Sequence, residues 1–224
     1  MSPDGRGRIV VLDYGIGNLR SAEKGLQHVD ADARLATDPR DVAGAAGVVL
    51  PGVGAFGPCM AALRRTGLAD AALGAINAGV PFLGICVGLQ MLCTSSAETP
   101  GAAGLGVIDA TVVPLPEGVK HPQMQWNKLV ARSGPGQESG SRSRMLAGIP
   151  EGSWMYFVHS FAPEITGETV AVCDYGGTVC AAVERGVVWG TQFHPEKSGR
   201  PGLAVLANFR DLVEEQGTSV PRAS

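Results

Sequence analysis

The sequence lacks a concentration of positive charge. Its 224 residues carry 18 basic and 21 acidic side chains, a formal net charge of -3, and no basic stripe that could neutralise a phosphate backbone. We therefore expect no nucleic-acid partner. An apolar run is also missing before Ile9, so we expect no secretory signal, and residues 1–8 are predicted to be a flexible N-terminus.

Paired cysteines are missing as well. The cysteines are odd in number, include no CxxC pair and lie mostly in apolar segments, where a reduced thiol packs as a small hydrophobic group; they are Cys59, Cys86, Cys93, Cys173 and Cys180. This usage is typical of a reducing compartment, so a cytoplasmic protein is expected. We expect neither a metal ion nor another cofactor.

Charge is absent altogether from residues 71–97, a stretch long enough to span a bilayer as one helix. A membrane protein is nevertheless not expected, because helix-breaking and polar residues divide this stretch. They predict a helix end, a short strand and a second helix start, and they are Asn77, Gly79, Pro81, Gly84, Gly88 and Gln90.

Short β-branched runs alternate with Ala/Leu helical patterns in the first half of the chain. Strands are predicted at 9–12, 48–50 and 80–85, with helices at 19–29, around 60–63 and at 68–76. Near-continuous apolar strands separated by helices imply a parallel sheet covered on both faces. Ligands collect at the carboxyl ends of such strands, so functional residues are expected just after Leu12, Leu50 and Ile85.

The second half is richer in predicted strands, at 107–113, 128–131, 154–158, 170–175, 179–184 and 187–193. Arg185 and Gly186 look like a hairpin tip, and an amphipathic helix carries Leu203, Leu206, Phe209 and Leu212 or Val213. Residues 133–144 are predicted to be a solvated loop and 215–224 a flexible tail. The chain is thus one α/β domain, 9–214, with a mixed, mostly parallel sheet flanked by helices.

Cys86 lies between a predicted buried strand and a predicted helix, with Gly84 and Gly88 two positions to either side. This spacing is typical of a strand-to-helix elbow that presents a nucleophile at the top of a sheet. The helix N-terminus favours the thiolate and leaves the Val87 N–H free to stabilise an oxyanion. Gln90, one helical turn on, could bind a polar substrate. A buried structural thiol is the alternative, which the flanking glycines disfavour.

A thiol nucleophile needs an imidazole base, and His194 ends a strand pattern beside an acidic residue. Pro195 restrains His194 to an extended conformation, so His194 and Glu196 can project to the same side, where Glu196 would orient the ring. From spacing alone, a surface histidine next to an unrelated carboxylate is an equally good interpretation. His159 follows another predicted strand and is a further candidate for lining the pocket.

The segment from Gly52 to Gly57 fits the GxGxxG pattern of a dinucleotide-binding loop. The next predicted strand, however, ends at Cys86 and not at the acidic residue that would bind a ribose. Pro58 follows the third glycine, where a phosphate-binding loop requires Lys. We favour a flexible loop in which Gly52, Val53 and Gly54 complete an oxyanion hole facing the thiol.

Three segments together resemble the class I (triad) glutamine amidotransferases, in the same order along essentially the whole chain: PGVGAF at 51–56, GICVGLQ at 84–90 and QFHPEKS at 192–198. The resemblance implies a flavodoxin-like fold, a triad of Cys86, His194 and Glu196, and hydrolysis of glutamine to glutamate and ammonia. It also implies that glutamine is held near Gly52, Gln90 and the backbone of Ser160 and Phe161.

Within that class, DYGIGNLRS at 13–21, HPQMQWN at 121–127 and YFVHSF at 156–161 are similar to glutaminase subunits of imidazole glycerol phosphate synthase, from histidine biosynthesis. This implies a heterodimer with a (β/α)8-barrel cyclase that consumes the ammonia, with Asn18 and Trp126 facing the partner. Gln125 departs from the family pattern, which usually has Gly there. The alternatives are a glutaminase of another pathway and a non-catalytic nucleotide-binding subunit.

Overall fold

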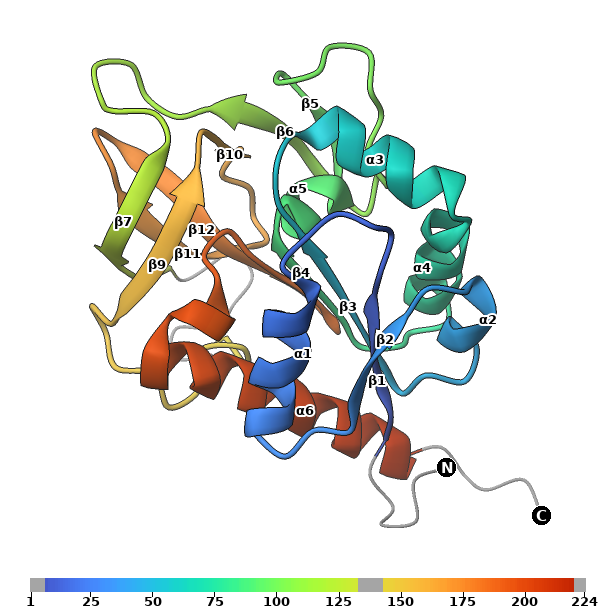
Figure 1. Cartoon of the computed structure of the whole chain (residues 1–224). Helices are drawn as coiled ribbons and strands as arrows, with labels where there is room; N and C mark the ends of the chain where they lie inside the picture. Colours follow the sequence, from blue (N-terminus) through green and yellow to red (C-terminus); the bar gives the residue numbers. More distant parts are fainter. Residues whose placement is uncertain (1–6, 133–142, 220–224) are drawn as a thin grey trace, which may run out of the picture.

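The computed structural model describes residues 7–132 and 143–219. Within these residues, an eight-stranded sheet forms the centre of the molecule in the order β2-β1-β3-β4-β13-β12-β11-β8 (Figure 1). Its strands are β1 (Ile9–Leu12), β2 (Ala33–Ala36), β3 (Gly47–Gly52), β4 (Phe82–Cys86), β8 (Val130–Ala131), β11 (Thr169–Asp174), β12 (Thr178–Arg185) and β13 (Val188–Thr191).

The central sheet is mixed, as predicted. Strands β2, β1, β3, β4 and β13 run parallel, whereas β12, β11 and β8 continue the sheet in antiparallel pairs. Every residue of β1, β3 and β4 is buried, as expected of strands that helices cover on both faces. Strands β12 and β13 form the expected hairpin, which turns at Gly186.

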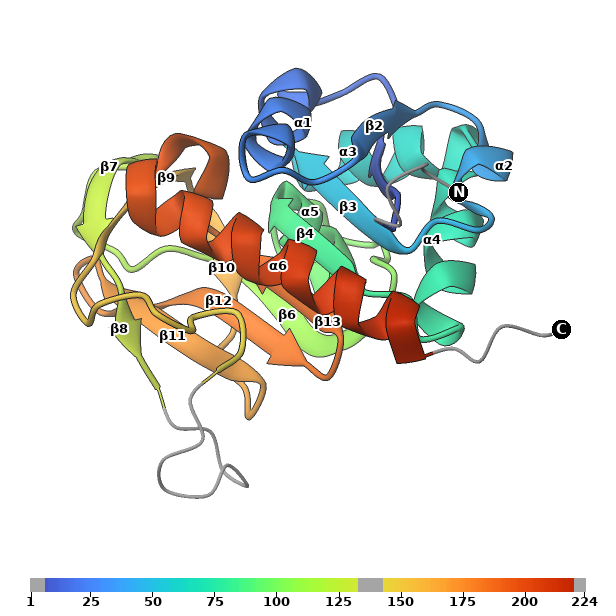
Figure 2. The same ribbon diagram turned by 90° about the horizontal axis from the view of Figure 1, so that it is seen from below.

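Helices lie on both faces of the central sheet (Figures 1 and 2). On one face, α1 (Leu19–His28) contacts α6 (Gly199–Ser219). The other face carries α2 (Pro39–Val42), α3 (Phe56–Arg65), α4 (Leu68–Asn77) and the short α5 (Val87–Leu92). A 3-10 turn, η1 (Pro195–Lys197), joins β13 to α6.

Helix α6 packs on the sheet through the predicted apolar stripe. Leu206 and Phe209 are fully buried, and the Phe209 ring contacts that of Trp189 on β13, with centroids 5.9 Å apart. The helix also runs to Ser219, into the segment expected to be a flexible tail. Residues 215–219 therefore continue the hydrogen-bonded helix, and 220–224 lie outside the described residues.

Two smaller sheets border the central one. The first comprises β5 (Cys93–Ser96), β6 (Ile108–Pro114) and β10 (Phe161–Pro163), and the second pairs β7 (Gln123–Lys128) with β9 (Trp154–His159). The strand predicted at 128–131 is interrupted at Leu129, because Lys128 ends β7 and β8 begins at Val130. Leu129 turns inward between them and bonds to the backbone of Ser153 and Gly152 instead of continuing a ladder.

The uncharged stretch at 71–97 contains the predicted helix end, strand and second helix, in α4, β4 and α5, and it also contains β5, which was not predicted. Among the described residues, none of the helices combines the length and apolarity needed to cross a membrane. Most of the loop predicted at 133–144 lies outside the described residues. Its end differs from the prediction, since Ser143 is buried and its hydroxyl donates to the carboxylate of Glu184.

The close packing of α5 on β3 yields a stability prediction. A Cβ added at Gly88 would lie 1.7 Å from the Leu50 carbonyl oxygen, and this backbone atom cannot move aside without breaking the sheet. We expect Gly88→Ala to lower the free energy of unfolding by ~3 kcal/mol or more, the upper end of overpacking effects. Urea titration followed by circular dichroism measures this loss.

Gly74→Ala is the matched control, because Gly74 lies in the exposed part of α4 and an added Cβ there meets nothing within 4 Å. Alanine favours the helix by ~0.5–1 kcal/mol over glycine, so this variant should be more stable than the parent. Equal stability of the two variants would contradict the packing argument.

Candidate active site

Cys86 occupies a strained turn at the carboxyl end of β4. Its backbone adopts φ 56° and ψ -112°, a left-handed conformation that is rare for a residue with a side chain, and α5 begins at the next residue. Gly84 and Gly88 make the turn possible, since a Cβ on either would collide with neighbouring backbone. The sequence prediction of an elbow here is confirmed by this geometry.

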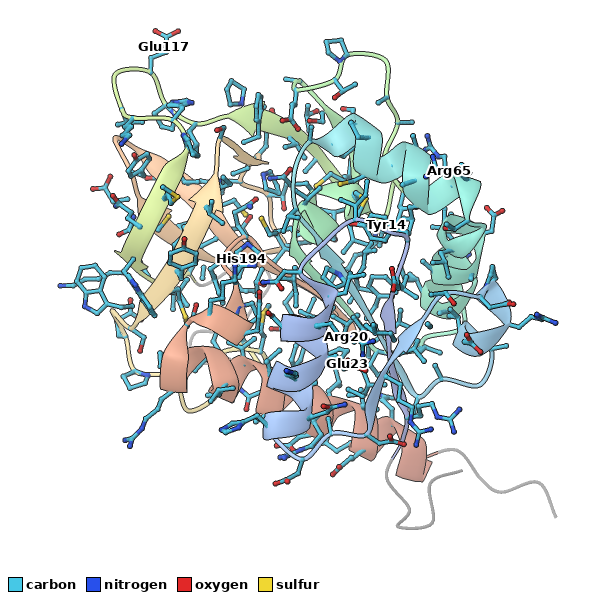
Figure 3. The ribbon with its side chains drawn as sticks, in the orientation of Figure 1. Tyr14, Arg20, Glu23, Arg65, Glu117 and His194 are labelled. Carbon is cyan, nitrogen blue, oxygen red and sulfur yellow. The ribbon has the colours of Figure 1, made fainter. Side chains whose placement is uncertain are left out.

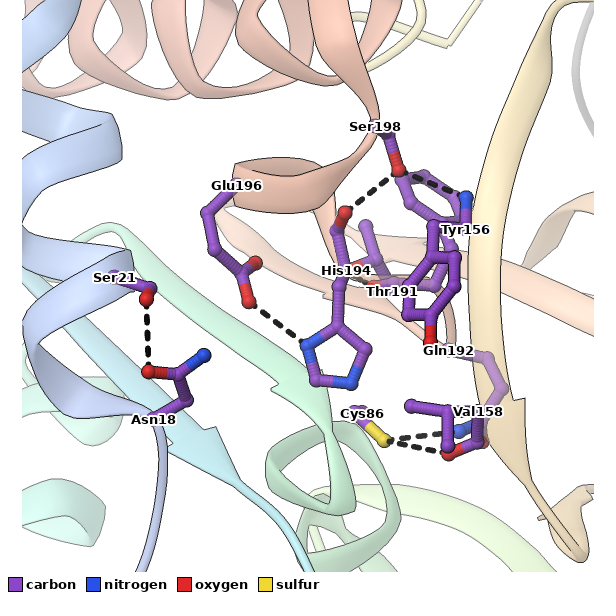
Figure 4. Close-up of polar contacts among 11 residues, drawn as sticks. Asn18, Ser21, Cys86, Tyr156, Val158, Thr191, Gln192, His194, Glu196 and Ser198 are labelled. Atoms are coloured by element: carbon purple, nitrogen blue, oxygen red, sulfur yellow. Dashed lines mark hydrogen bonds and ion pairs between the residues drawn. The ribbon is translucent and has the colours of Figure 1, made fainter. Parts of the chain in front are cut away.

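His194 reaches Cys86 because β13 lies beside β4 in the sheet. The two strands pair in parallel with Thr191 opposite Ile85, so both chains leave the sheet at the same edge. Figure 3 labels His194 beside β9, and in Figure 4 its ring points toward Cys86. Its Nε2 atom is buried and has no hydrogen-bond partner among the described residues. The Nε2 lone pair or proton is thus available to the sulfur or to a bound substrate.

Glu196 orients the His194 ring from the opposite side. The Glu196 Oε1 atom lies 2.9 Å from Nδ1 of His194, and both side chains are only 2% exposed. A carboxylate can only accept this bond, so Nδ1 carries a proton. Cys86, His194 and Glu196 therefore lie in the linear order that the sequence predicted.

The environment of His194 favours its protonated form. Burial lowers the pKa of His194, but the interactions with the Cys86 sulfur and the Glu196 carboxylate raise it by more, to about 10. A protonated imidazole beside the sulfur stabilises a thiolate and can later donate its proton to a leaving group.

The backbone around His194 is tied to β9 by contacts that the sequence did not reveal. The His194 N–H donates to the Tyr156 carbonyl at 3.0 Å, and the Ser198 hydroxyl donates to the His194 carbonyl at 2.6 Å while accepting from the Tyr156 N–H (Figure 4). Ser198 is 1% exposed. These bonds fix the position from which the imidazole projects.

A cavity of about 250 Å³ opens over Cys86. Eight predicted residues line it, namely Val53, Gly54, Cys86, Val87, Gln90, Ser160, Phe161 and His194. Gly52 is not among the lining residues, because it pairs with Cys86 inside the sheet, and Glu196 lies behind His194. His159, the further candidate for lining the pocket, also lies in the cavity wall, and three lining residues had no assigned role in the sequence prediction: Glu98, Pro122 and Val158.

The amide group of Gln90, which was expected to bind substrate, is already partly engaged by hydrogen bonds within the protein. Its Nε2 donates to the Phe161 carbonyl at 2.8 Å and to Gln192 Oε1 at 3.0 Å, which uses both amide hydrogens. Only its Oε1 atom can therefore serve a substrate, as an acceptor. Gln192, fully buried, was missed as a site residue, although it begins the same QFHPEKS segment as His194.

The glycine-rich loop ends in a helix N-terminus that a side chain already occupies. The Phe56 N–H, at the start of α3, donates to Glu98 Oε2 at 2.8 Å, and the Gly57 N–H donates to the Thr99 hydroxyl. A carboxylate thus stands where a dinucleotide would place its pyrophosphate. This arrangement argues against the nucleotide-binding alternative. Glu98 is also one of the residues that line the cavity.

His159 is a neutral part of the cavity wall, as the sequence allowed. Its Nδ1 lies 2.9 Å from the Phe161 carbonyl, which can only accept, so Nδ1 carries the proton. Burial lowers the pKa of His159 to about 4. His159 therefore stays uncharged at neutral pH and does not compete with His194 as a cationic acid.

The family model of class I glutamine amidotransferases matches residues 10–212 of this chain. The chain therefore belongs to the class I glutamine amidotransferases. The solved structure of PurLQS from Thermotoga maritima has the same fold, with a TM-score of 0.72 at 18% identity over 92% of this chain and 99% of that one.

Two curated relatives narrow the family further. Imidazole glycerol phosphate synthase subunit HisH of Methanothermobacter thermautotrophicus is 45% identical over 92% of this chain and 98% of its own length. The HisH subunit of Syntrophotalea carbinolica is 44% identical over 91% of this chain and 100% of its own length. Within its class, the chain is a member of the HisH family of imidazole glycerol phosphate synthase subunits.

The raised pKa of His194 yields a titration prediction. Because this pKa lies above the ordinary value of 6.5, protonation of His194 stabilises the fold fully below about pH 6.5, and the contribution is lost as pH rises toward about 10. Removing the sulfur in Cys86→Ala should lower the pKa of His194. Burial, which lowers this pKa, is then counteracted by the Glu196 carboxylate alone. An NMR titration of the imidazole, assigned with His194→Gln, measures the change.

Cys93→Ala provides the matched control. Cys93 is as buried as Cys86, but it bonds to the Leu89 carbonyl and lies outside the cavity wall. The His194 titration should be unchanged in this variant. An unchanged titration in Cys86→Ala as well would show that the sulfur does not act on the ring.

Proposed function

We propose that this chain is the glutaminase subunit of an imidazole glycerol phosphate synthase and hydrolyses L-glutamine to glutamate and ammonia. The single observation that carries the chemistry is the alignment of Glu196, His194 and Cys86 at the elbow, with 2.9 Å between Glu196 and the ring. The HisH relatives, at 41–45% identity over most of the chain, support the pathway.

The first chemical step is attack of the Cys86 thiolate on the side-chain carboxamide carbon of glutamine. A carbon–sulfur bond forms and the carbonyl electrons move to oxygen, which gives a tetrahedral oxyanion. The Val87 N–H, at the start of α5, is the proposed first donor to this oxyanion. The Val53 and Gly54 backbone, across the cavity, supplies the second donor in this proposal.

Collapse of the intermediate releases ammonia. The carbon–nitrogen bond breaks as protonated His194 gives its proton to the leaving nitrogen, and a thioester remains on Cys86. Neutral His194 then accepts a proton from water, and the resulting hydroxide attacks the thioester carbon. Glutamate leaves and the thiolate and imidazolium are restored. Glu196 keeps the ring in one tautomer throughout and balances its positive charge.

The polar groups of the cavity suit an amino-acid substrate. The Glu98 carboxylate is a negative group in the cavity wall, so we assign it to the α-ammonium group of glutamine. The backbone of Ser160 and Phe161 is the proposed contact for the α-carboxylate end, and Gln90 contributes its Oε1 as an acceptor. Glutamine in this orientation extends its carboxamide toward Cys86.

The proposed partner is a cyclase with a (β/α)8 barrel, which would form a heterodimer with this chain and consume the ammonia. Three large apolar side chains support a docking face on β7 and β9: Met124, Trp126 and Trp154 are 63%, 47% and 51% exposed. The Trp126 ring contacts that of Tyr156, which in turn lies 6.5 Å from the His194 ring. This face therefore adjoins the catalytic base.

Asn18 is proposed to contact the same partner. It is half-buried at the start of α1, and its Oδ1 accepts a bond from the Ser21 hydroxyl at 2.8 Å (Figure 4).

Docking of the cyclase beside His194 would deliver ammonia without exposure to water, where it would be protonated. The five cysteines are all free and buried, which supports our assignment of the complex to the cytoplasm.

The proposed chemistry predicts a graded loss of glutaminase activity. Cys86→Ala should lower ammonia release from glutamine by more than ~10³-fold, because the thioester cannot form. Glu196→Gln should cause a smaller loss, since the nucleophile and the base remain. Ammonia release is measured with the cyclase present, and binding of the cyclase to Cys86→Ala should be retained. Full activity of Cys86→Ala would refute the assignment of the nucleophile.

Partner docking is predicted to rotate the loop at 51–54 so that its backbone N–H groups complete the oxyanion hole. Gly54 has φ 91° with open space around the position of a Cβ, so this loop can rotate, and the Val53 carbonyl is held by the Cys59 thiol at 3.2 Å. We expect the isolated chain to hydrolyse glutamine much more slowly than the complex with cyclase and its ligand. Trp126→Ala should reduce this activation by weakening docking. Equal turnover with and without the partner would contradict this prediction.

A further inference from the structure

Two buried amide side chains, those of Gln90 and Gln192, connect the Phe161 carbonyl in the cavity wall to the sulfur of Cys86. Gln192 Nε2 donates to Cys86 Sγ at 3.6 Å, and Gln90 Nε2 donates to Gln192 Oε1 at 3.0 Å and to the Phe161 carbonyl at 2.8 Å. Gln192 is fully buried and Gln90 is 3% exposed. The contact between Gln192 and the sulfur is drawn in Figure 4.

The Phe161 carbonyl determines which group donates and which accepts in each of these hydrogen bonds. The Phe161 carbonyl can only accept, so the NH2 group of Gln90 must face it. The same nitrogen faces Gln192, which must therefore present its oxygen to Gln90. The Gln192 amide is left with its NH2 group toward the sulfur. A flipped Gln192 would break the bond to Gln90 and place an oxygen against Cys86.

We propose that Gln192 is a positioning residue that donates a hydrogen bond to the Cys86 thiolate and that Gln90 sets its orientation. The proposal rests on the proposed function in one respect, that Cys86 is the nucleophile. An N–H donor to an anionic sulfur stabilises it more than a donor to a neutral thiol, because bonds to charged groups are the stronger ones. Gln192 thereby acts alongside His194 from a different side.

The opposite contact of Cys86 shows why this donor matters. The Val158 carbonyl oxygen lies 3.9 Å from Sγ and can accept from the neutral S–H, but it repels the thiolate. A thiol can thus bond to both Val158 and Gln192, which lie on the same side of the sulfur in Figure 4, whereas a thiolate keeps only the donor. The Gln192 N–H counteracts the repulsion between the Val158 carbonyl and the thiolate. It can bond to the sulfur both as a thiol and as a thiolate.

Other titratable groups surround the sulfur and must be held constant in a test. His194 follows β13, Tyr14 follows β1 and Cys59 lies on α3. Glu98, just after β5, and His159, the last residue of β9, line the cavity. None of these groups bonds to Gln192 among the described residues. Substitution of Gln192 therefore leaves their direct contacts with one another in place.

The orientation of Gln192 depends on a segment that touches substrate. The Phe161 carbonyl also accepts from His159 Nδ1, so both of its lone pairs are used, and Ser160 and Phe161 line the cavity. Movement of this segment on substrate binding would be transmitted through Gln90 to the amide beside the sulfur. Such a movement would couple the nucleophile to occupancy of the amino-acid end of the cavity.

The test measures how the rate of Cys86 alkylation by iodoacetamide depends on pH in the full chain, with labelling of Cys86→Ala subtracted. Gln192→Met keeps the size of the side chain and removes the donor. Its pH midpoint should rise by ~1–2 pH units, the size of one lost hydrogen bond to a charged group. Gln192→Glu should raise the midpoint further, because a carboxylate faces the sulfur.

Gln216→Met is the matched control, since Gln216 is exposed on α6, and its midpoint should equal that of the parent chain. An unchanged midpoint in folded Gln192→Met would overturn the proposal. If circular dichroism shows Gln192→Met to be unfolded, Gln90→Met gives the answer, because loss of the orienting amide should raise the midpoint by a smaller amount and an unchanged midpoint would again refute it.

Alkylation does not require glutaminase activity, so the two proposals fail separately. A raised midpoint in Gln192→Met, together with no ammonia release by the parent chain and cyclase, would reject the proposed function and retain the hydrogen bond. Ammonia release by the parent with an unchanged midpoint would reject the role of Gln192 alone. In the complex, Gln192→Met should lower kcat more than it raises KM for glutamine.

Discussion

The active site depends on the left-handed backbone of Cys86 at the end of β4. A non-glycine residue in this conformation costs ~1–3 kcal/mol, so the surrounding structure must hold it. Pairing of β4 with β3 and β13 fixes the strand before the turn, and contact of Gly88 with the Leu50 carbonyl fixes the helix after it. The sulfur is consequently aimed into the cavity by the backbone itself.

The second part of the site follows β13, the last parallel strand of the sheet, which also pairs antiparallel with β12. The hairpin of β12 and β13 returns the chain to β4 about a hundred residues after Cys86, and η1 then presents Glu196 behind His194. Strand β9 covers the cavity and binds the backbone of His194 through Tyr156. The nucleophile and the base therefore belong to distant parts of the sequence, but they are carried by adjacent parallel strands.

The features that could be predicted from the sequence are those marked by apolar periodicity or by turn residues. The buried strands β1, β3 and β4 and the stripe of α6 have strong apolar patterns, and the glycines about Cys86 predicted its turn. Strand β7 was missed because most of its side chains are exposed, so no alternation marks it. Glu98 and Gln192 were missed for another reason: their roles arise from contacts between segments distant in sequence, and no local pattern records such contacts.

Burial of Cys86 has a consequence for the durability of the protein. A thiolate that faces solvent is readily oxidised to sulfenic and then sulfinic acid, and the later step is generally irreversible. Cys86 is only 2% exposed, and its sulfur lies 3.9 Å from the carbonyl oxygen of Val158 on β9. Peroxide must therefore enter the same cavity as a substrate, so a molecule bound in that cavity protects the sulfur from oxidation.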